Sequence, residues 1–217
     1  EADDGMATAQ FKDPENAIVC SADKDLLMVA GWKLNMTDYS IVHVKDKFGH
    51  IELDRSKSSP KVKGLGTKFF WAQLLMGDQA DNISGVPKVA GRMWQQFQPT
   101  KAYTDLYEQW IAATDPEVSR KLEERIKKLE AKPKACGAVL TYDILKDARD
   151  DRECWETIKA CYVELERDHD FQYTHWRTGE VVTPTQALFG EMQLLWMRRT
   201  KDKNDVLNWL KTEVLKK

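Results

Sequence analysis

Acidic residues gather at three places within the first 81 residues of this 217-residue chain. The groups are Glu1, Asp3 and Asp4; Asp23 and Asp25; and Asp78 and Asp81. Positions three apart share a helix face, and positions two apart in a loop can point the same way, so each group can present its carboxylates together. Carboxylates that met at one place would repel one another, and a divalent metal ion supplies the counter-charge they need.

Oxygen ligands without histidine or cysteine favour Mg²⁺ or Mn²⁺ over zinc. Two such ions about 4 Å apart would activate a water molecule and stabilise the leaving oxygen of a phosphodiester. Acidic residues at loops and helix ends are also commonly just solvated, and that interpretation stays open for each group taken alone. The metal hypothesis therefore requires the three groups to converge in space.

The bulk composition is that of a folded chain, with 42% hydrophobic and 31% charged residues. A formal net charge of -2 does not by itself indicate a nucleic-acid partner, although an acidic metal site and a basic surface cancel in such a sum. The four cysteines show no C-x-x-C spacing, which argues against zinc and against a disulfide framework. With no signal-peptide pattern and no apolar run of about 18 residues, we expect a soluble, cytoplasmic protein.

The front of the chain carries the pattern of an open α/β sheet. Residues 16–20 form an apolar run typical of a fully buried parallel strand, and two of the aspartates follow it, where such sheets collect ligands. We expect a short helix ending at Gly31, then a hairpin joining 39–44 to 50–53, then an apolar helix over 69–77.

Beyond residue 82 the strand pattern stops, and we expect helices. Asp115 and Thr183 each precede a proline, as a helix N-cap precedes proline at the first helical position. The sequence therefore predicts an α/β region at 1–77 and a helical region at 78–217.

The loop after Asp81 has features that suit close backbone approach. Gly85 permits such an approach, and Pro87 is expected to begin a helix whose first amides face outward as a phosphate cradle. Lys88 and Arg92, four residues apart, would flank the cradle with positive charge. A plain helix-turn-helix corner in a helical subdomain fits the same features equally well.

Three stretches together resemble the successive signatures of the flap endonuclease and 5′ to 3′ exonuclease family. "EADDGMA", "VCSADKDLLMV" and "LLMGDQADNISGVPKVAG" are similar to E-A-D-D, S-x-D-x-D and G-D-x-x-D-N-I-x-G-V-x-G-I-G, in the family's order. The resemblance is close from residue 1 to about residue 97. The helical tail is similar to that of phage-encoded members.

The resemblance implies a two-metal centre that holds Mg²⁺ or Mn²⁺. Its carboxylates would divide between the two ions, with Asp23 near both: Glu1, Asp3 and Asp4 for the first ion, and Asp25, Asp78 and Asp81 for the second. Catalysis would depend most on Asp4, Asp23 and Asp78.

The resemblance also implies a helix-three-turn-helix element at about residues 78–97, which grips duplex DNA by its backbone and can hold K⁺ through loop carbonyls. The DNA-binding positions that carry over are Ser84, Gly85, Val86, Lys88, Ala90, Gly91 and Arg92. Such a grip reads phosphate and shape, with little base specificity. The sequence departs from the family where Lys88, Val89 and Ala90 replace G-I-G, with Gly91 after them.

The family's amino-terminal half, with its first strands and the arch that threads a 5′ end, has no counterpart in the sequence. We therefore expect a PIN-like, flap-endonuclease-type parallel sheet that is incomplete, its N-terminal strands missing. A preceding segment or a second chain would complete it.

The expected function is two-metal hydrolysis of DNA phosphodiesters by a 5′ to 3′ exonuclease or flap endonuclease. It would serve phage DNA replication, recombination or host-DNA degradation in the cytoplasm of an infected bacterial cell. The alternatives are a non-catalytic duplex-DNA-binding module, one half of a split nuclease that needs a partner chain, and a PIN-like ribonuclease.

Overall fold

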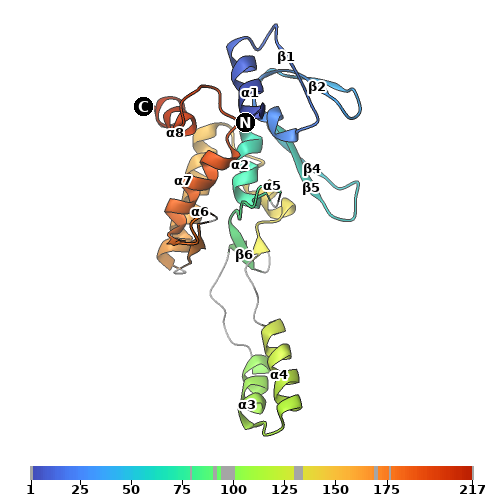
Figure 1. The fold of residues 1–217 in the computed structure, drawn as a ribbon, viewed down its shortest axis with the longest axis vertical. Helices are drawn as coiled ribbons and strands as arrows, with labels where there is room; N and C mark the ends of the chain where they lie inside the picture. The colour runs from blue at the N-terminus through green and yellow to red at the C-terminus, as the bar shows by residue number, and fades with distance from the viewer. Residues whose placement is uncertain are drawn as a thin grey trace.

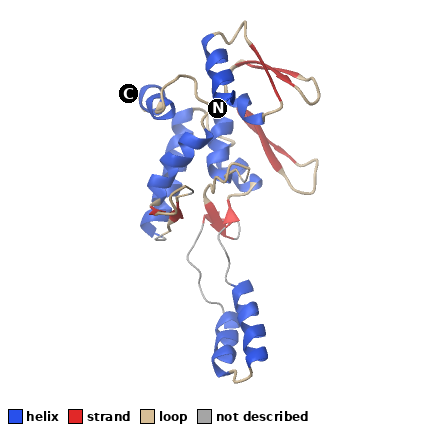
Figure 2. Cartoon of the chain, viewed as in Figure 1, coloured by secondary structure: helices blue, strands red, loops and turns tan. Residues whose placement is uncertain are grey.

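The computed structural model describes residues 2–78, 80–89, 92–93, 101–129, 134–168, 171–175 and 177–216. The first part of the chain is mixed α/β, with a small sheet and a hairpin, and the remainder is mainly helical (Figure 1, Figure 2). Within these ranges, no helix combines the length and the apolar character needed to cross a membrane.

The chain begins with a helix and a small mixed sheet. Helix α1 spans Ala2–Lys12, and the sheet has the order β1-β2-β3, with strands Ile18–Ser21, Gly31–Asn35 and Ile41–Val44. β1 runs parallel to β2, so the prediction of a parallel strand at 16–20 is confirmed. The prediction that it is fully buried is wrong, because Ile18 is 50% exposed and Cys20 is exposed.

Two of the predicted connections are wrong. The segment predicted as a helix ending at Gly31 is a short 3-10 helix, η1 (Lys24–Met28), and Gly31 begins strand β2. The predicted hairpin does not form, because β3 pairs with β2 while β4 (His50–Asp54) pairs with β5 (Lys61–Leu65). Strand β5 thus lies between β4 and the apolar helix, where the sequence predicted no strand.

Helix α2 (Gly66–Met76) is the centre of the main core. It is buried on every side over its first ten residues, as predicted, and Phe70 and Trp71 are fully buried. The helices that pack around it are α5 (Ala138–Leu145), α6 (Asp151–Asp168) and α7 (Pro184–Leu195) (Figure 1). The C-terminal helices α8 (Asp205–Trp209) and η2 (Leu210–Val214) extend the same core. An apolar helix enclosed in this way gives the residues that follow it a rigid base.

Short strands occur beyond residue 82, which corrects the prediction of helices alone. β6 (Pro87–Val89) pairs with β7 (Arg92–Met93) and β8 (Lys134–Ala135), and β9 (Tyr173–Thr174) pairs with β10 (Val181–Val182). The prediction of a helix beginning at Pro87 is therefore wrong. Proline's fixed φ and missing N–H suit the first residue of a strand as well as a helix start, and tertiary pairing decides between them.

Helices α3 (Lys101–Ala112) and α4 (Pro116–Leu129) pack on each other around Leu106, Leu122 and Ile126. Asp115 caps α4 by accepting from the N–H groups of Glu117 and Val118, and Thr183 forms a capping box at α7. Both predicted N-caps are confirmed.

One strand residue contradicts the apolar pattern of the sheet. Lys33 lies between Val19 and Val42 in the register and is only 5% exposed. Its Nζ donates to Oε1 of Gln10 on α1. Burial lowers the pKa of Lys33 to about 8.

The buried lysine predicts how stability changes with pH. Between about pH 8 and 10.5 the folded protein has released the Lys33 proton while the unfolded chain still holds it. The free energy of unfolding should therefore rise with pH in this window, and Lys33→Met should remove that part of the slope. Urea unfolding of both proteins at several pH values measures the difference, and identical slopes would contradict the assignment.

Candidate metal centre

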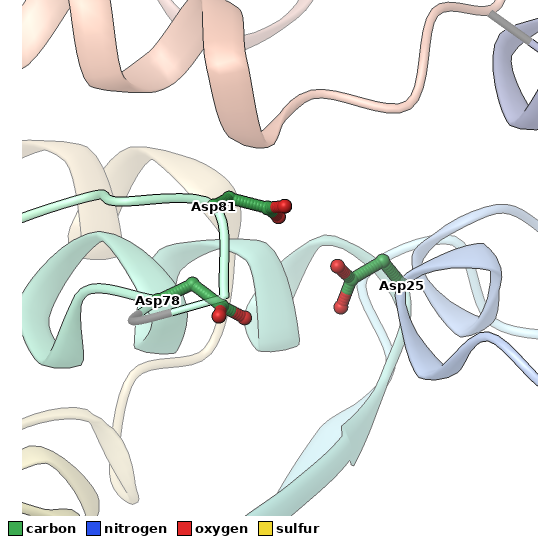
Figure 3. Close-up of side chains that lie close together, drawn as sticks. All are labelled: Asp25, Asp78 and Asp81. Atoms are coloured by element: carbon green, nitrogen blue, oxygen red, sulfur yellow. The ribbon is translucent and has the colours of Figure 1, made fainter. Parts of the chain in front are cut away.

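Three aspartates from two distant segments place their carboxylates together. One oxygen from each of Asp25, Asp78 and Asp81 lies within 4.8 Å of the others. Figure 3 shows the three side chains facing a common space, Asp25 from one side and the other two from the opposite side. Asp25 is buried, Asp78 is half-buried and Asp81 is exposed, so the group opens to solvent on one side.

A cavity of about 470 Å³ extends this group toward α1. Its acidic lining residues are Asp3, Asp4, Asp23, Asp25 and Asp81. With Asp78 beside them, the structure brings together six of the seven carboxylates singled out in the sequence. Glu1 lies outside the described residues.

Local structure fixes the carboxylates on the β1 side. Asp3 and Asp4 lie in the first turn of α1. Asp23 is the N-cap of η1, and its Oδ1 accepts from the N–H of Asp25 at 2.8 Å. Asp23 and Asp25 are therefore held by the turn that ends the parallel strand.

A tight turn positions Asp78 and Asp81. Asp78 exchanges two backbone hydrogen bonds with Ile83, of 3.0 and 2.8 Å. Gly77 and Gly85 approach each other at the base of the turn with φ of 69° and 64°, and a Cβ on Gly85 would lie 2.3 Å from the Gly77 nitrogen. Only glycine fits both positions.

A buried carboxylate anchors the same turn from below. Glu191 of α7 accepts from the N–H groups of Ser84 and Gly85, and from the hydroxyl of Tyr162 at 2.6 Å. Burial raises the pKa of Glu191, and these hydrogen bonds oppose the rise. Tyr173 adds a hydrogen bond from its hydroxyl to the Gly85 carbonyl, at 3.0 Å.

The hydrogen bonds to Glu191 bear on the predicted DNA-binding loop, because they use backbone amides that were expected to face outward. The amides of Ser84 and Gly85 face Glu191, and Val86 is buried, with its N–H donating to the Leu75 carbonyl. The predicted outward cradle is therefore wrong for these three residues. Lys88 and Arg92 lie on neighbouring strands instead of one helical turn apart. Ala90 and Gly91 lie outside the described residues.

Lys24 supplies positive charge to the triad. Its Nζ lies 2.7 Å from Oδ2 of Asp78 and 3.4 Å from Oδ1 of Asp25. Burial alone would raise the pKa of Asp78, but the hydrogen bonds from Lys24 and from the Ala80 N–H outweigh it and the pKa is lowered. Burial raises the pKa of Asp25 despite hydrogen bonding from Gln73, so a proton competes with a cation at Asp25.

A second positively charged side chain, that of Arg198, lies on the α1 side of the cavity. Arg198 binds Asp4 through Nε at 2.7 Å and through its backbone N–H at 3.0 Å. The structure thus gives Arg198 an acidic partner. Asp3, Asp4 and Asp23 thus line the cavity without forming a compact ligand set of their own.

The donor set fits one hard divalent cation. Asp25, Asp78 and Asp81 offer three carboxylate oxygens close enough to share an ion, without sulfur or nitrogen ligands. Gln73 orients Asp25 by donating from Nε2 at 2.7 Å, and its Oε1 is buried without a hydrogen-bond partner among the described residues. An unpaired carbonyl oxygen beside the carboxylates suits a water or a cation.

Sequence reasoning missed three supporting residues, Lys24, Gln73 and Glu191. Lys24 stands between two of the chosen aspartates, and Glu191 stands in the apolar stripe of α7 between Leu188 and Met192. A charged residue inside such a stripe signals a buried partner. Gln73 carries the same signal more weakly within α2.

The triad predicts a cation site that a single substitution removes. Asp78→Asn should weaken Mn²⁺ binding at least tenfold, because it removes a charged ligand and leaves Lys24 to compete with the metal for Asp25. Isothermal titration calorimetry measures the affinity, with the exposed Asp105→Asn on α3 as the charge-matched control. Equal affinity in the two variants would contradict the site.

The Glu191 anchor predicts a loss of stability. Glu191→Ala leaves two backbone amides and the Tyr162 hydroxyl without their acceptor, which should lower the free energy of unfolding by about 3 kcal/mol. Urea denaturation tests this against Glu156→Ala, an exposed glutamate on α6. A loss no larger than that of the control would show that Glu191 does not hold the turn.

The chain matches no protein-family model, no curated protein and no solved structure. No relative therefore supplies a substrate or a reaction. What the chain does has to be inferred from the position of its own carboxylates and from the groups that hold them.

Proposed function

We propose that the chain is a divalent-metal-dependent nuclease that hydrolyses DNA phosphodiesters near a 5′ end, of the flap endonuclease or 5′ to 3′ exonuclease type. The observation that carries the proposal is the gathering of aspartates from α1, from η1 and from the turn after α2 at one cavity. These are the positions at which the sequence resembles that family.

In this proposal Asp25, Asp78 and Asp81 hold the cation, Mg²⁺ or Mn²⁺. When bound, such an ion polarises a phosphodiester and lowers the pKa of a water molecule. The resemblance adds a second ion near Asp3, Asp4 and Asp23. That ion would require Asp4 to exchange Arg198 for the metal.

The other residues of the site position the ligands and attract the substrate. Gln73 fixes the rotamer of Asp25, and the Glu191 anchor holds the turn that carries Asp81. Arg198 and Lys203 line the acidic cavity and would attract the phosphates of an approaching strand. The carboxylates alone would repel DNA, so these cations are needed for binding.

The resemblance implies that backbone amides of the loop after Asp81 bind DNA. In this proposal they contribute less, because the amides of Ser84 and Gly85 already donate to Glu191. Ser84 and Asn82, on the turn that follows Asp81, are exposed and can contact a backbone phosphate. The proposed role in phage DNA replication, recombination or host-DNA degradation is based on the sequence resemblance alone.

A nuclease that needs a partner chain is the second candidate, and the edge of the sheet favours it. Among the strands that the structure describes, β1 pairs with β2 alone, and it exposes Ile18 and Cys20. A strand that added to this edge would cover apolar surface and complete a larger parallel sheet.

Cleavage of a DNA duplex with a 5′ flap, labelled at its 5′ end, tests the proposal. With Mn²⁺ we expect release of short 5′ products, and Asp78→Asn should slow it by about 100-fold or more, since a metal ion contributes several kcal/mol to such reactions. Asp105→Asn should cleave at the wild-type rate.

Two other outcomes favour the alternatives. Salt-sensitive DNA binding without cleavage in Mn²⁺ would contradict the nuclease and support a binding module, while cleavage that appears only with an added chain would support the split enzyme. Faster cleavage of the matching RNA would support a ribonuclease.

A further inference from the structure

A second cavity, of about 400 Å³, adjoins the acidic one at Asp23, which lines both. It lies between the inner face of the β1-β2-β3 sheet, the η1 turn and strand β5. Three lysines line it, namely Lys24, Lys33 and Lys63. Among the lining residues that the structure describes, Asp23 is the sole acidic one, and its Oδ1 already accepts from the Asp25 N–H.

Lys33 is the unusual member of this lining. It stands at the middle of the inner sheet face, 5% exposed, where the neighbouring strands place Val19 and Val42. Among the described residues no carboxylate lies within ion-pair distance of its Nζ, which donates to the side-chain oxygen of Gln10. With a pKa of about 8 it is mostly protonated at neutral pH. A buried ammonium that only an amide supports is costly, and an anion would offset that cost.

The rest of the lining suits a phosphate group attached to an organic body. Lys63 contributes a second ammonium at the rim, 60% exposed and 2.8 Å from Asp54. Asn35 accepts the Thr37 N–H through Oδ1, which leaves its Nδ2 hydrogens for an anion. The apolar lining residues Val19, Leu26, Leu27 and Val42 can contact a sugar or a base. The volume is in the range of sites for small organic ligands, well above what a bare phosphate fills.

We propose that this cavity binds a nucleotide unit through its phosphate, with Lys33 as the buried charge partner. The proposal rests on the nuclease function given above and deepens it. The pocket would hold a nucleotide of the substrate strand next to the phosphodiester at the acidic cavity. It would thereby contribute to the choice of which bond is cut.

Binding of thymidine 5′-monophosphate to the metal-free protein in EDTA tests the proposal without any need for cleavage. By calorimetry, we expect wild-type protein to bind the nucleotide, thymidine to bind at least tenfold more weakly, and Lys33→Met to lose at least tenfold in affinity for the nucleotide. Lys57→Met, which removes an exposed lysine outside the lining, is the matched control and should bind as wild type.

A wild-type measurement covers the case in which Lys33→Met does not fold. Saturating nucleotide should raise the pKa of Lys33 above its free value, because a bound phosphate favours the protonated amine, and NMR of the lysine side chains reads this directly. An unchanged Lys33 pKa, or equal nucleotide affinity in Lys33→Met and Lys57→Met, would overturn the proposal. Inorganic phosphate that binds as tightly as the nucleotide would also overturn it, since the pocket would then recognise no part of a strand.

The pocket and the nuclease can fail separately. If Lys33→Met retains Mn²⁺ binding but loses the nucleotide, the pocket stands whether or not the chain cleaves DNA. If Asp78-dependent cleavage occurs while no nucleotide binds in EDTA, the nuclease stands and the pocket proposal falls.

Discussion

Repulsion among carboxylates is the constraint around which the site is organised. Asp25, Asp78 and Asp81 come within 4.8 Å of one another, an arrangement that is unfavourable in the ionised state without positive charge nearby. Lys24 supplies such charge on one side of the cavity and Arg198 supplies it on the other. The arrangement is explained if the carboxylates exchange these internal cations for a metal ion and a substrate.

Buried side chains and hydrogen bonds hold the carboxylates in place against this repulsion. α2 is enclosed by aromatic and aliphatic side chains, and the turn that follows it is fixed by two close glycines, by a pair of backbone hydrogen bonds and by Glu191. On the opposite side η1 is capped by one of the carboxylates themselves. The site thus stands where a parallel strand and a core helix both end, which is where α/β folds ordinarily collect their ligands.

Some elements could be predicted from short stretches of the sequence alone. The apolar run at β1, the largely apolar sequence of α2 and the caps at Asp115 and Thr183 each follow from residues within a few positions of one another. The predicted hairpin between β3 and β4 does not form because each strand pairs with its other neighbour in sequence, β3 with β2 and β4 with β5, and strand β2 was not predicted. The prediction at Pro87 failed for a different reason, because its strand pairs with residues 134 and 135, far along the sequence.

For the site, the sequence indicated which carboxylates to consider but not the groups that hold them. The partners of Asp4 and of the 84–85 amides come from residues more than 100 positions away, on or after α7. Lys33 was missed because the strand that carries it was not predicted.

A crystal of the protein grown with Mn²⁺ and measured at the manganese absorption edge tests the central claim most directly. The account predicts an anomalous peak between the side chains of Asp25, Asp78 and Asp81, with Lys24 displaced from Asp78. The absence of a peak at full Mn²⁺ saturation, or a peak bound by other residues while Lys24 still pairs with Asp78, would contradict it.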